Sequence, residues 1–237
     1  MAKAGAGSPA TMRVLVLGST GVVGDAIVRE ALADSRIGAV IAASRRPLRH
    51  ASAKLQTAIL EDFSDFGPLA PLLANVDAVL CALGLSWYQA KDEAHYRTIT
   101  HDYVMACARA AAAANPAGRF SFVSGHGASA ESSQAWARIK AETENDLEAM
   151  YGARLTVFRP GYIHPFYGRE AAYWGDAVMR PFLPLRGYMT RWITDSREVA
   201  RAVLYAAMGG DVPRLADNRA VIAAAAAYDR SRGEIAT

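Results

Sequence analysis

A glycine-rich turn near the start of the chain, GSTGVVG at residues 18–24, constrains the fold more than any other feature. The apolar run 12–18 precedes it and is typical of a strand buried on both faces of a parallel sheet. Residues 21–34 follow with apolar positions at helical spacing. Glycine suits such a junction because the chain turns tightly there and its backbone can approach a pyrophosphate at the helix N-terminus. A tight turn without a ligand is the alternative, but the position of the loop favours dinucleotide binding.

The rest of the chain alternates short β-like runs with longer helical ones. Strands are expected at 12–18, 37–44, 54–62, 77–84, 119–125 and 154–161, and helices at 21–34, 92–115, 132–152 and 194–210. Prolines favour a short or broken helix between the third and fourth strands, and the tail from 211 could end in a strand or a helix. The pattern predicts an α/β fold with a doubly wound, mostly parallel sheet (a Rossmann fold), formed by one domain over 12–237.

Composition excludes several classes of function. The net charge of +3 comes from scattered basic residues, which disfavours nucleic acid as a partner. Cys81 and Cys107 lie in apolar stretches and are expected to be core residues in a reducing compartment. No stretch approaches the roughly 20 apolar residues of a membrane span. Residues 1–11 lack the apolar run of a secretory signal, so we expect a disordered tail and a cytoplasmic protein.

The end of the second strand indicates which dinucleotide binds. NAD sites usually place an acid here for the ribose hydroxyls, whereas this chain has Ser44, Arg45 and Arg46. Guanidinium groups make forked, charge-assisted hydrogen bonds to phosphate oxygens, so NADP(H) is favoured over NAD(H). A solvated basic turn is the alternative. Asp62 after the third strand is placed to meet the adenine amine, although a surface acid is the competing interpretation.

These motifs, with CALG (81–84), FVSG (122–125) and FRPG (158–161), resemble the short-chain dehydrogenase/reductase superfamily over residues 12–208. The similarity is to its atypical and extended branches, including HTATIP2-like and sugar-epimerase-like proteins. It implies an NAD(P)-dependent oxidoreductase in which a serine, a tyrosine and a lysine four residues later act on the substrate. The motifs and the resemblance together assign the cofactor to Gly18, Ser19, Thr20, Gly21, Val22, Val23, Gly24, Ser44, Arg45, Arg46, Asp62, Phe63, Ala82, Leu83, Gly84, Lys140, Pro160, Gly161 and Tyr162.

The resemblance matches Ser124 and Lys140 to the family serine and lysine, but Trp136 stands at the tyrosine position. An indole has an N–H donor and no group that titrates near neutral pH, so Trp136 cannot relay a proton. Three interpretations stay open. A displaced donor could be Tyr162, with His126, Tyr88 and, more weakly, Ser133 as alternatives. The protein could instead be a non-catalytic NADP(H)-binding redox sensor or regulator. Trp136 could also stack on substrate or nicotinamide in an enzyme that needs no tyrosine.

We therefore expect Ser124, Lys140 and Tyr162 to be catalytic, and Trp136 and His126 to form a wall for nicotinamide or an unidentified small-molecule substrate. Residues 162–193 are rich in aromatics and prolines and are expected to form a lid over the cofactor end of the sheet. Core packing is the alternative, and a membrane-surface helix is the weakest one. No metal site is expected, because His50, His95 and His101 are not near acids or cysteines at ligand spacing. The resemblance also implies possible homodimerisation through the helices at 92–115 and 133–150.

Overall fold

The computed structural model describes residues 11–168 and 180–233. The expected disordered tail therefore lies outside the described residues except for Thr11, as does the stretch 169–179 of the expected lid.

Seven strands form one parallel sheet, which confirms the predicted Rossmann topology. In chain order they are β1 (Met12–Leu17), β2 (Ile37–Ser44), β3 (Leu55–Ile59), β4 (Ala78–Cys81), β5 (Arg119–Val123), β6 (Leu155–Arg159) and β9 (Leu215–Asp217). Their spatial order is β3-β2-β1-β4-β5-β6-β9, and every neighbouring pair is parallel. The order reverses direction between β1 and β4, which is where a doubly wound sheet leaves a crevice at the carboxyl ends of its strands.

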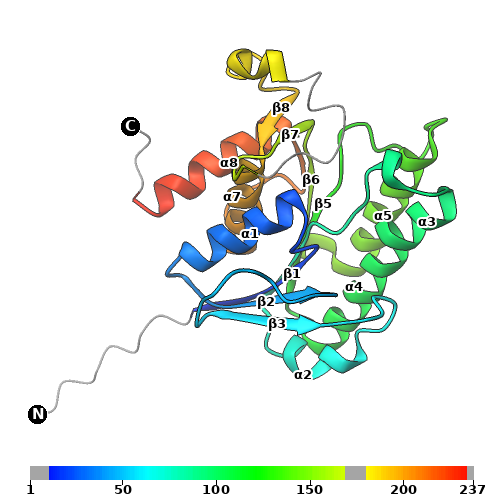
Figure 1. Cartoon of the computed structure of the whole chain (residues 1–237), viewed down its shortest axis with the longest axis vertical. Helices are drawn as coiled ribbons and strands as arrows, with labels where there is room; N and C mark the ends of the chain where they lie inside the picture. Colours follow the sequence, from blue (N-terminus) through cyan, green and yellow to red (C-terminus); the bar gives the residue numbers. More distant parts are fainter. Residues whose placement is uncertain (1–10, 169–179, 234–237) are drawn as a thin grey trace, which may run out of the picture.

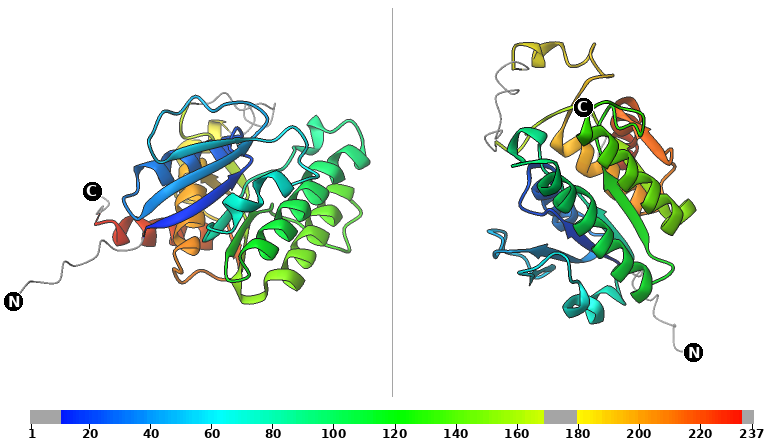
Figure 2. Two further views of the ribbon diagram at one scale, coloured as in Figure 1. Left: turned by 90° about the horizontal axis from the view of Figure 1, so that it is seen from below. Right: turned by 90° about the vertical axis from the view of Figure 1, so that its right-hand side faces the viewer.

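Helices cover both faces of this sheet (Figures 1 and 2). One face carries α1 (Val22–Ala33), α7 (Ser196–Ala207) and α8 (Asn218–Ser231), and the other carries α2 (Ala70–Leu73), α4 (Tyr103–Ala114) and α5 (Ala135–Tyr151). Each layer has its own apolar core, because alternate residues of β1 and its neighbours point to opposite faces. Leu15 and Leu17 belong to the α4–α5 core, while Val14 and Val16 belong to the α1–α7 core.

The expected helix at 92–115 has an irregular start. It begins as α3 (Glu93–Arg97), passes through a π-helical turn at Thr98–Asp102 and continues as α4. Nothing in the apolar spacing indicates the π turn. The tail contains both of the alternatives left open from the sequence, since the short strand β9 leads directly into α8. The N-cap of α7 is Asp195, which forms a capping box with Glu198.

The aromatic-rich segment leaves the sheet at β6 and returns to α7. Its described parts include β7 (Tyr162–His164), a 3-10 helix at Arg180–Leu185 and β8 (Ile193–Asp195). β7 and β8 pair in parallel as a separate two-stranded sheet, which the sequence pattern did not indicate. None of the described helices is long and apolar enough to cross a membrane.

Candidate functional site

The glycine loop between β1 and α1 is packed so closely that two of its positions exclude a side chain. Gly18 has a φ of +80°, and a Cβ there would lie 2.6 Å from the backbone of Ala82 and Leu83 after β4. A Cβ at Gly24 would lie 2.0 Å from the carbonyl oxygen of Gly18. The loop is thus pressed against β4 on one side and against its own helix on the other. This compact βα turn fits the backbone cradle that a pyrophosphate requires.

A cleft beside this loop, here called the loop cleft, brings together many of the residues predicted to bind the cofactor. It is lined by Gly18, Ser19, Thr20, Ala43, Ser44, Arg45, Glu61, Phe63, Leu83, Ile99 and Tyr103. The rings of Phe63 and Tyr103 lie 6.0 Å apart at its apolar side. Ala43, Glu61, Ile99 and Tyr103 were not predicted. Ile99 and Tyr103 arrive from the π turn and the start of α4, far along the chain from the glycine loop.

Some predicted cofactor residues lie at the edges of the loop cleft or away from it. The Asp62 carboxylate accepts hydrogen bonds from the backbone N–H of Ser64 at 2.8 Å and from its hydroxyl at 2.7 Å. These bonds lower the Asp62 pKa and occupy the carboxylate within its own turn. The neighbours Glu61 and Phe63 line the cleft instead. Six more members of the predicted set lie next to this cleft without lining it, at the start of α1 or in the loops after β1 and β4: Gly21, Val22, Val23, Gly24, Ala82 and Gly84. The other predicted residues that do not line it are Arg46, Lys140, Pro160, Gly161 and Tyr162.

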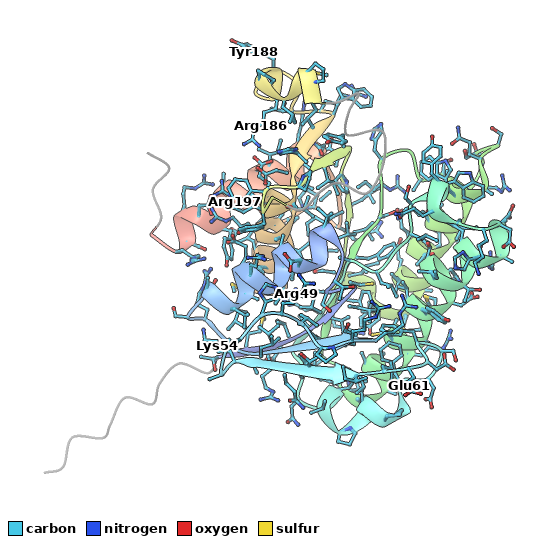
Figure 3. The ribbon with its side chains drawn as sticks, in the orientation of Figure 1. Arg49, Lys54, Glu61, Arg186, Tyr188 and Arg197 are labelled. Carbon is cyan, nitrogen blue, oxygen red and sulfur yellow. The ribbon has the colours of Figure 1, made fainter. Side chains whose placement is uncertain are left out.

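A second cleft, here called the basic cleft, continues from the first around the end of β2. It shares Ser19, Thr20, Ser44 and Arg45 with the loop cleft and adds Asp25, Arg29, Arg46, Pro47, Leu48, Arg49 and His50. Arg45, Arg46 and Arg49 are exposed and form no ion pair with any residue that the structure describes. Figure 3 shows Arg49 beside α1 and Glu61 at the end of β3. The cationic groups therefore gather on the side of the loop that faces α1.

Arg29 and His50 differ from those three arginines because Asp25 holds both of them. The Asp25 carboxylate bonds the Arg29 guanidinium and the His50 ring, each at 2.8 Å. This contact contradicts the expectation that His50 is isolated from acids. The two residues are 25 positions apart, so the spacing along the chain could not reveal it.

A third cleft, here called the aromatic cleft, lies between the loop after β4 and the start of α5. Its volume is about 800 Å³, within the range of small-molecule sites. It is lined by Leu85, Ser86, Trp87, Tyr88, Glu93, Tyr96, Ser133, Gln134, Ala135, Trp136, Arg138 and Lys140. The structure thus places Trp136 and Lys140 at one cleft, four residues apart on α5. Leu85 and Trp87 in its wall were not singled out in the sequence.

Lys140 carries the clearest electrostatic perturbation in this cleft. Burial lowers the pKa of Lys140 to about 8, although the nearby Glu144 carboxylate opposes the shift. The ammonium nitrogen lies 5.7 Å from the ring centre of Phe122 on β5. A lysine of this kind is still mostly charged at neutral pH but loses its proton within a unit or so above it.

Ser124, at the end of β5, has a hydroxyl that is already engaged. It donates a hydrogen bond to the Glu144 carboxylate, and the Arg159 guanidinium binds the same carboxylate through Nε at 3.0 Å. Ser124 and Glu144 are both buried, and Arg159 comes from β6. The predicted serine is therefore next to the lysine-bearing helix, but its proton points to a carboxylate and not to a substrate.

Of the remaining predicted residues, Trp136 lies at the start of α5, whereas His126 and Tyr162 both contact Trp192. The Trp136 indole N–H donates to the Gln134 side chain, and its ring lies 3.5 Å from where a Cβ at Gly127 would be. His126 packs its ring edge-to-face on Trp192, with ring centres 4.9 Å apart. Tyr162 donates its backbone N–H to the Trp192 carbonyl at 2.7 Å. Tyr88, but neither Tyr162 nor His126, is among the described residues that line the aromatic cleft.

The junction between β6 and β7 is also tightly packed. The Gly161 N–H bonds the Asn218 side chain at 2.9 Å, and a Cβ at Gly161 would lie 2.3 Å from the Trp192 carbonyl oxygen. The carbonyl of Pro160 accepts the backbone N–H of His126 at 2.9 Å. The described parts of the aromatic-rich segment are therefore fastened to the loops that follow β5 and β6.

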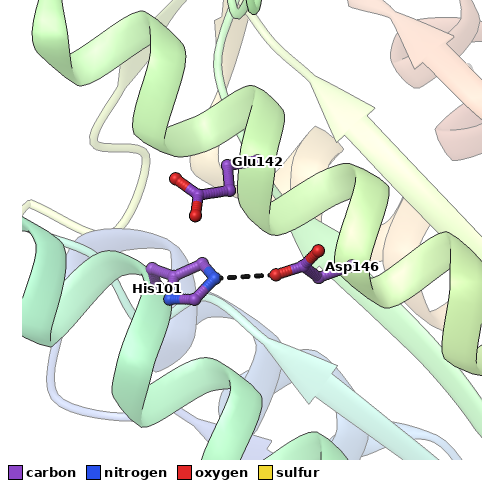
Figure 4. Close-up of side chains that lie close together, drawn as sticks. All are labelled: His101, Glu142 and Asp146. Atoms are coloured by element: carbon purple, nitrogen blue, oxygen red, sulfur yellow. Dashed lines mark hydrogen bonds and ion pairs between the residues drawn. The ribbon is translucent and has the colours of Figure 1, made fainter.

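A separate cluster joins the π turn to α5 (Figure 4). The His101 ring bonds Asp146 at 3.0 Å and Asp102 at 2.7 Å, and Glu142 lies beside it. The expectation that His101 stands apart from acids is wrong, because its partners on α5 are more than 40 residues away. His101, Glu142 and Asp146 are close enough to hold a metal ion, but the Arg97 guanidinium already neutralises Glu142. We therefore assign this cluster to joining the two helices.

Comparisons with known proteins agree with this geometry. A family model described as NAD(P)H-binding matches residues 18–165. The protein fmp52, mitochondrial, of Aspergillus niger is 31% identical over 213 residues, covering 84% of this chain and 90% of the relative. The protein HTATIP2 of Rattus norvegicus is 28% identical over 219 residues, covering 88% and 87%. The resemblance expected from the motifs is thereby confirmed.

Solved structures show the same fold. A short chain dehydrogenase from Burkholderia cenocepacia, determined in complex with NADP, has a TM-score of 0.65 at 17% identity and covers 96% of this chain and 98% of its own. An oxidoreductase of the short chain dehydrogenase/reductase family from Burkholderia thailandensis also has a TM-score of 0.65, at 20% identity, with coverage of 88% and 90%.

Proposed function

This chain belongs to the NAD(P)H-binding family, and from that premise we propose that it binds NADP(H) and acts as an atypical oxidoreductase on a small molecule. A group other than residue 136 supplies the proton in this proposal. The cofactor, when bound, supplies or accepts a hydride at its nicotinamide ring. The residues of the chain bind it, orient it and control the proton.

The observation that carries the choice of NADP(H) is the continuity between the loop cleft and the basic cleft. A dinucleotide whose pyrophosphate lies on the glycine loop would direct its adenosine ribose toward Ser44 and Arg45, which line both clefts. A 2′-phosphate there would meet Arg45, Arg46 and Arg49, whose side chains have no carboxylate partner among the described residues. Uncompensated guanidinium groups favour a phosphate dianion over a bare hydroxyl.

A titration of the purified protein with NADPH and NADH tests this assignment. In the double variant Arg45→Glu/Arg46→Glu we expect the NADPH Kd to rise roughly 30-fold or more, because two charge-assisted contacts become repulsive. The NADH Kd should change by less than about threefold. The double variant Arg109→Glu/Arg219→Glu, at exposed positions of α4 and α8, is the matched control, since it makes the same charge change at residues that line neither cleft. Equal affinity of the unmodified protein for NADH and NADPH would refute the assignment.

The chemistry of the proposal centres on Lys140, which would hold the nicotinamide ribose and present a positive charge to the reacting oxygen. Ser124 would support that position through Glu144. Tyr162 is the displaced proton donor expected from the sequence, and Tyr88 competes with it because it lines the aromatic cleft with Lys140. Loss of kcat in Tyr162→Phe but not in Tyr88→Phe would locate the donor at residue 162, and the reverse result at residue 88.

Two features of the site favour the rival function, a non-catalytic NADP(H) sensor or regulator. Trp136 cannot donate a proton to an oxyanion as tyrosine does, and the hydroxyl of Ser124 is held by Glu144. A panel of carbonyl substrates followed by NADPH oxidation separates the two functions. NADPH binding without turnover of any substrate would support the regulator.

The cellular location and assembly remain predictions. We expect a cytoplasmic protein, and the names of the fungal relatives make mitochondria the alternative to test by cell fractionation. A homodimer through α4 and α5 is expected from the family resemblance and is tested by light scattering of the purified protein.

A further inference from the structure

The walls of the aromatic cleft suggest what kind of molecule enters it. Trp87 and Tyr88 are 37% and 68% exposed, and Trp136 on α5 lines the same cleft. Aromatic faces that the protein leaves accessible at a concave site bind planar ring systems by stacking. The volume of about 800 Å³ has room for such a ring beside a nicotinamide.

Lys140 gives this cleft one cationic end. Lys140 and Arg138 both reach this cleft from α5. The Lys140 ammonium group is buried, whereas the Arg138 guanidinium lies 3.9 Å from the Glu93 carboxylate. An aromatic ligand that develops negative charge on an oxygen would therefore be held between the rings and the ammonium.

The missing tyrosine restricts the reaction further. Reduction of an ordinary aldehyde or ketone produces an alkoxide, whose basicity is comparable to that of hydroxide because water has a pKa of about 15.7. Such an oxygen requires a positioned acid. Reduction of a quinone produces a phenolate-type oxygen, and a phenol such as tyrosine has a pKa of about 10. The charge of an ammonium group can stabilise that weaker base as it forms, without the help of a tyrosine.

We propose that the aromatic cleft binds a planar quinone and that Lys140 stabilises the hydroquinone oxyanion formed when the quinone is reduced. This inference rests on the proposed function. The overall change is quinone + NADPH + H⁺ giving hydroquinone + NADP⁺. One quinone oxygen takes up the hydride and becomes a hydroxyl, the ring becomes aromatic, and the other oxygen carries the second electron pair as an oxyanion. That oxyanion then takes a proton from water, so neither Trp136 nor Ser124 has to donate one.

Binding of 2-naphthol without any cofactor tests the cleft independently of activity. This stable phenol carries the ring and the ionisable hydroxyl of the product, and its naphtholate form has a distinct ultraviolet absorbance. We expect bound 2-naphthol to ionise about one pH unit below free 2-naphthol. In Lys140→Met that shift should disappear while binding persists. In Trp87→Leu and Tyr88→Leu the Kd should rise roughly tenfold.

The control variant is Tyr188→Leu, which removes an aromatic side chain that is 93% exposed and does not line the cleft. It should leave 2-naphthol binding unchanged. Two cleft variants are used so that a folding defect in one does not decide the result. Binding that is insensitive to both Trp87→Leu and Tyr88→Leu, or ionisation that is insensitive to Lys140→Met, would overturn the inference.

Turnover then separates failure of this inference from failure of the proposed function. With NADPH, and after subtraction of the rate without protein, kcat/KM for 2-methyl-1,4-naphthoquinone should exceed that for benzaldehyde roughly 100-fold. Trp87→Leu should raise KM for the quinone more than it lowers kcat. NADPH binding with equal rates for both substrates would overturn the quinone assignment and leave the proposed function standing. Failure to bind NADPH would overturn the proposed function itself.

Discussion

The hydroxyl of Ser124 donates a hydrogen bond to the buried carboxylate of Glu144. Glu144 lies one helical turn beyond Lys140 on α5, and Arg159 neutralises it from β6. The group that the family resemblance assigns to the substrate is thus part of a buried polar network that supports the lysine. Such networks stabilise a fold when every member is paired and are costly when one member is removed.

Ser124→Ala should therefore act mainly on stability. Removing a hydrogen bond to a buried charged group costs about 1.5–3 kcal/mol in the free energy of unfolding, measurable by urea denaturation. Because the hydroxyl proton is not available to substrate, kcat/KM should fall by less than about threefold. Glu144→Gln is the comparison, since it leaves Arg159 without a charge partner and should destabilise more. A loss of activity in Ser124→Ala that far exceeds its loss of stability would restore a direct catalytic role.

The glycine loop gives a prediction that separates packing from cofactor contact. In Gly24→Ala the new methyl group would meet the Gly18 carbonyl at 2.0 Å, so we expect a loss of about 3 kcal/mol in stability together with loss of NADPH binding. In Gly21→Ala the corresponding distance is 3.3 Å, and stability should fall by at most about 1 kcal/mol. NADPH binding should weaken in both variants, because the backbone at residue 21 is expected to approach the pyrophosphate. Thermal unfolding and NADPH titration of the two proteins check this.

The features that could be predicted from the sequence depend on adjacent residues or on the regular spacing of residues along a helix. β1, the glycine loop and α1 follow each other directly, and Arg45 and Arg46 adjoin a strand whose end is set by the sheet. Their positions could therefore be predicted from neighbouring residues alone. Trp136 and Lys140 could be paired because residues four apart share a helix face.

What could not be predicted depends on contacts between distant segments. Ile99 and Tyr103 reach the loop cleft because a π turn shifts the helix by a residue, and no apolar period encodes that turn. Arg29 joins the basic cleft only once α1 packs beside the end of β2. The bond of Ser124 to Glu144 spans 20 residues, and that of His101 to Asp146 spans 45. Residue types indicate that such groups need partners, but not which partners the fold supplies.

Asp34, at the end of α1, provides a prediction about acid stability. Burial alone would raise the pKa of Asp34, but hydrogen bonds from Arg36 and Tyr228 lower this pKa to about 2, from 3.8. A carboxylate with a depressed pKa stabilises the fold above its unfolded pKa, and this contribution is lost as pH falls from about 4 towards 2. Asp34→Asn should cost roughly 2 kcal/mol at pH 7, and progressively less below pH 4. Urea denaturation measures it, with the exposed Asp211→Asn as control; equal effects of the two would contradict the assignment.

The loss of the Lys140 proton predicts how kcat falls at alkaline pH. Burial lowers its pKa to about 8, so the charged form decreases as pH rises through that value, well before an exposed lysine would lose its proton. If the ammonium stabilises the reacting oxygen, kcat at saturating NADPH should fall roughly tenfold per pH unit above pH 8. The Lys140→Met variant should have a lower kcat, and this kcat should not fall near pH 8. The Glu144 carboxylate is the charged neighbour that sustains the ammonium, so Glu144→Gln should move the fall in kcat to lower pH.

Trp136→Tyr tests whether α5 presents residue 136 to the reacting atoms. Tyrosine is smaller than tryptophan and loses one hydrogen bond to Gln134, so the cleft can accept it without overpacking. Its phenol would lie one turn from the ammonium of Lys140, which favours the phenolate and makes the hydroxyl a better acid. We expect benzaldehyde reduction to rise about 100-fold, the typical contribution of a positioned acid, while NADPH affinity changes little. Trp136→Phe, which has the same ring without the hydroxyl, should show no gain. Equal activity of the tyrosine and phenylalanine variants would mean that residue 136 does not face the carbonyl, and that a donor elsewhere must be sought.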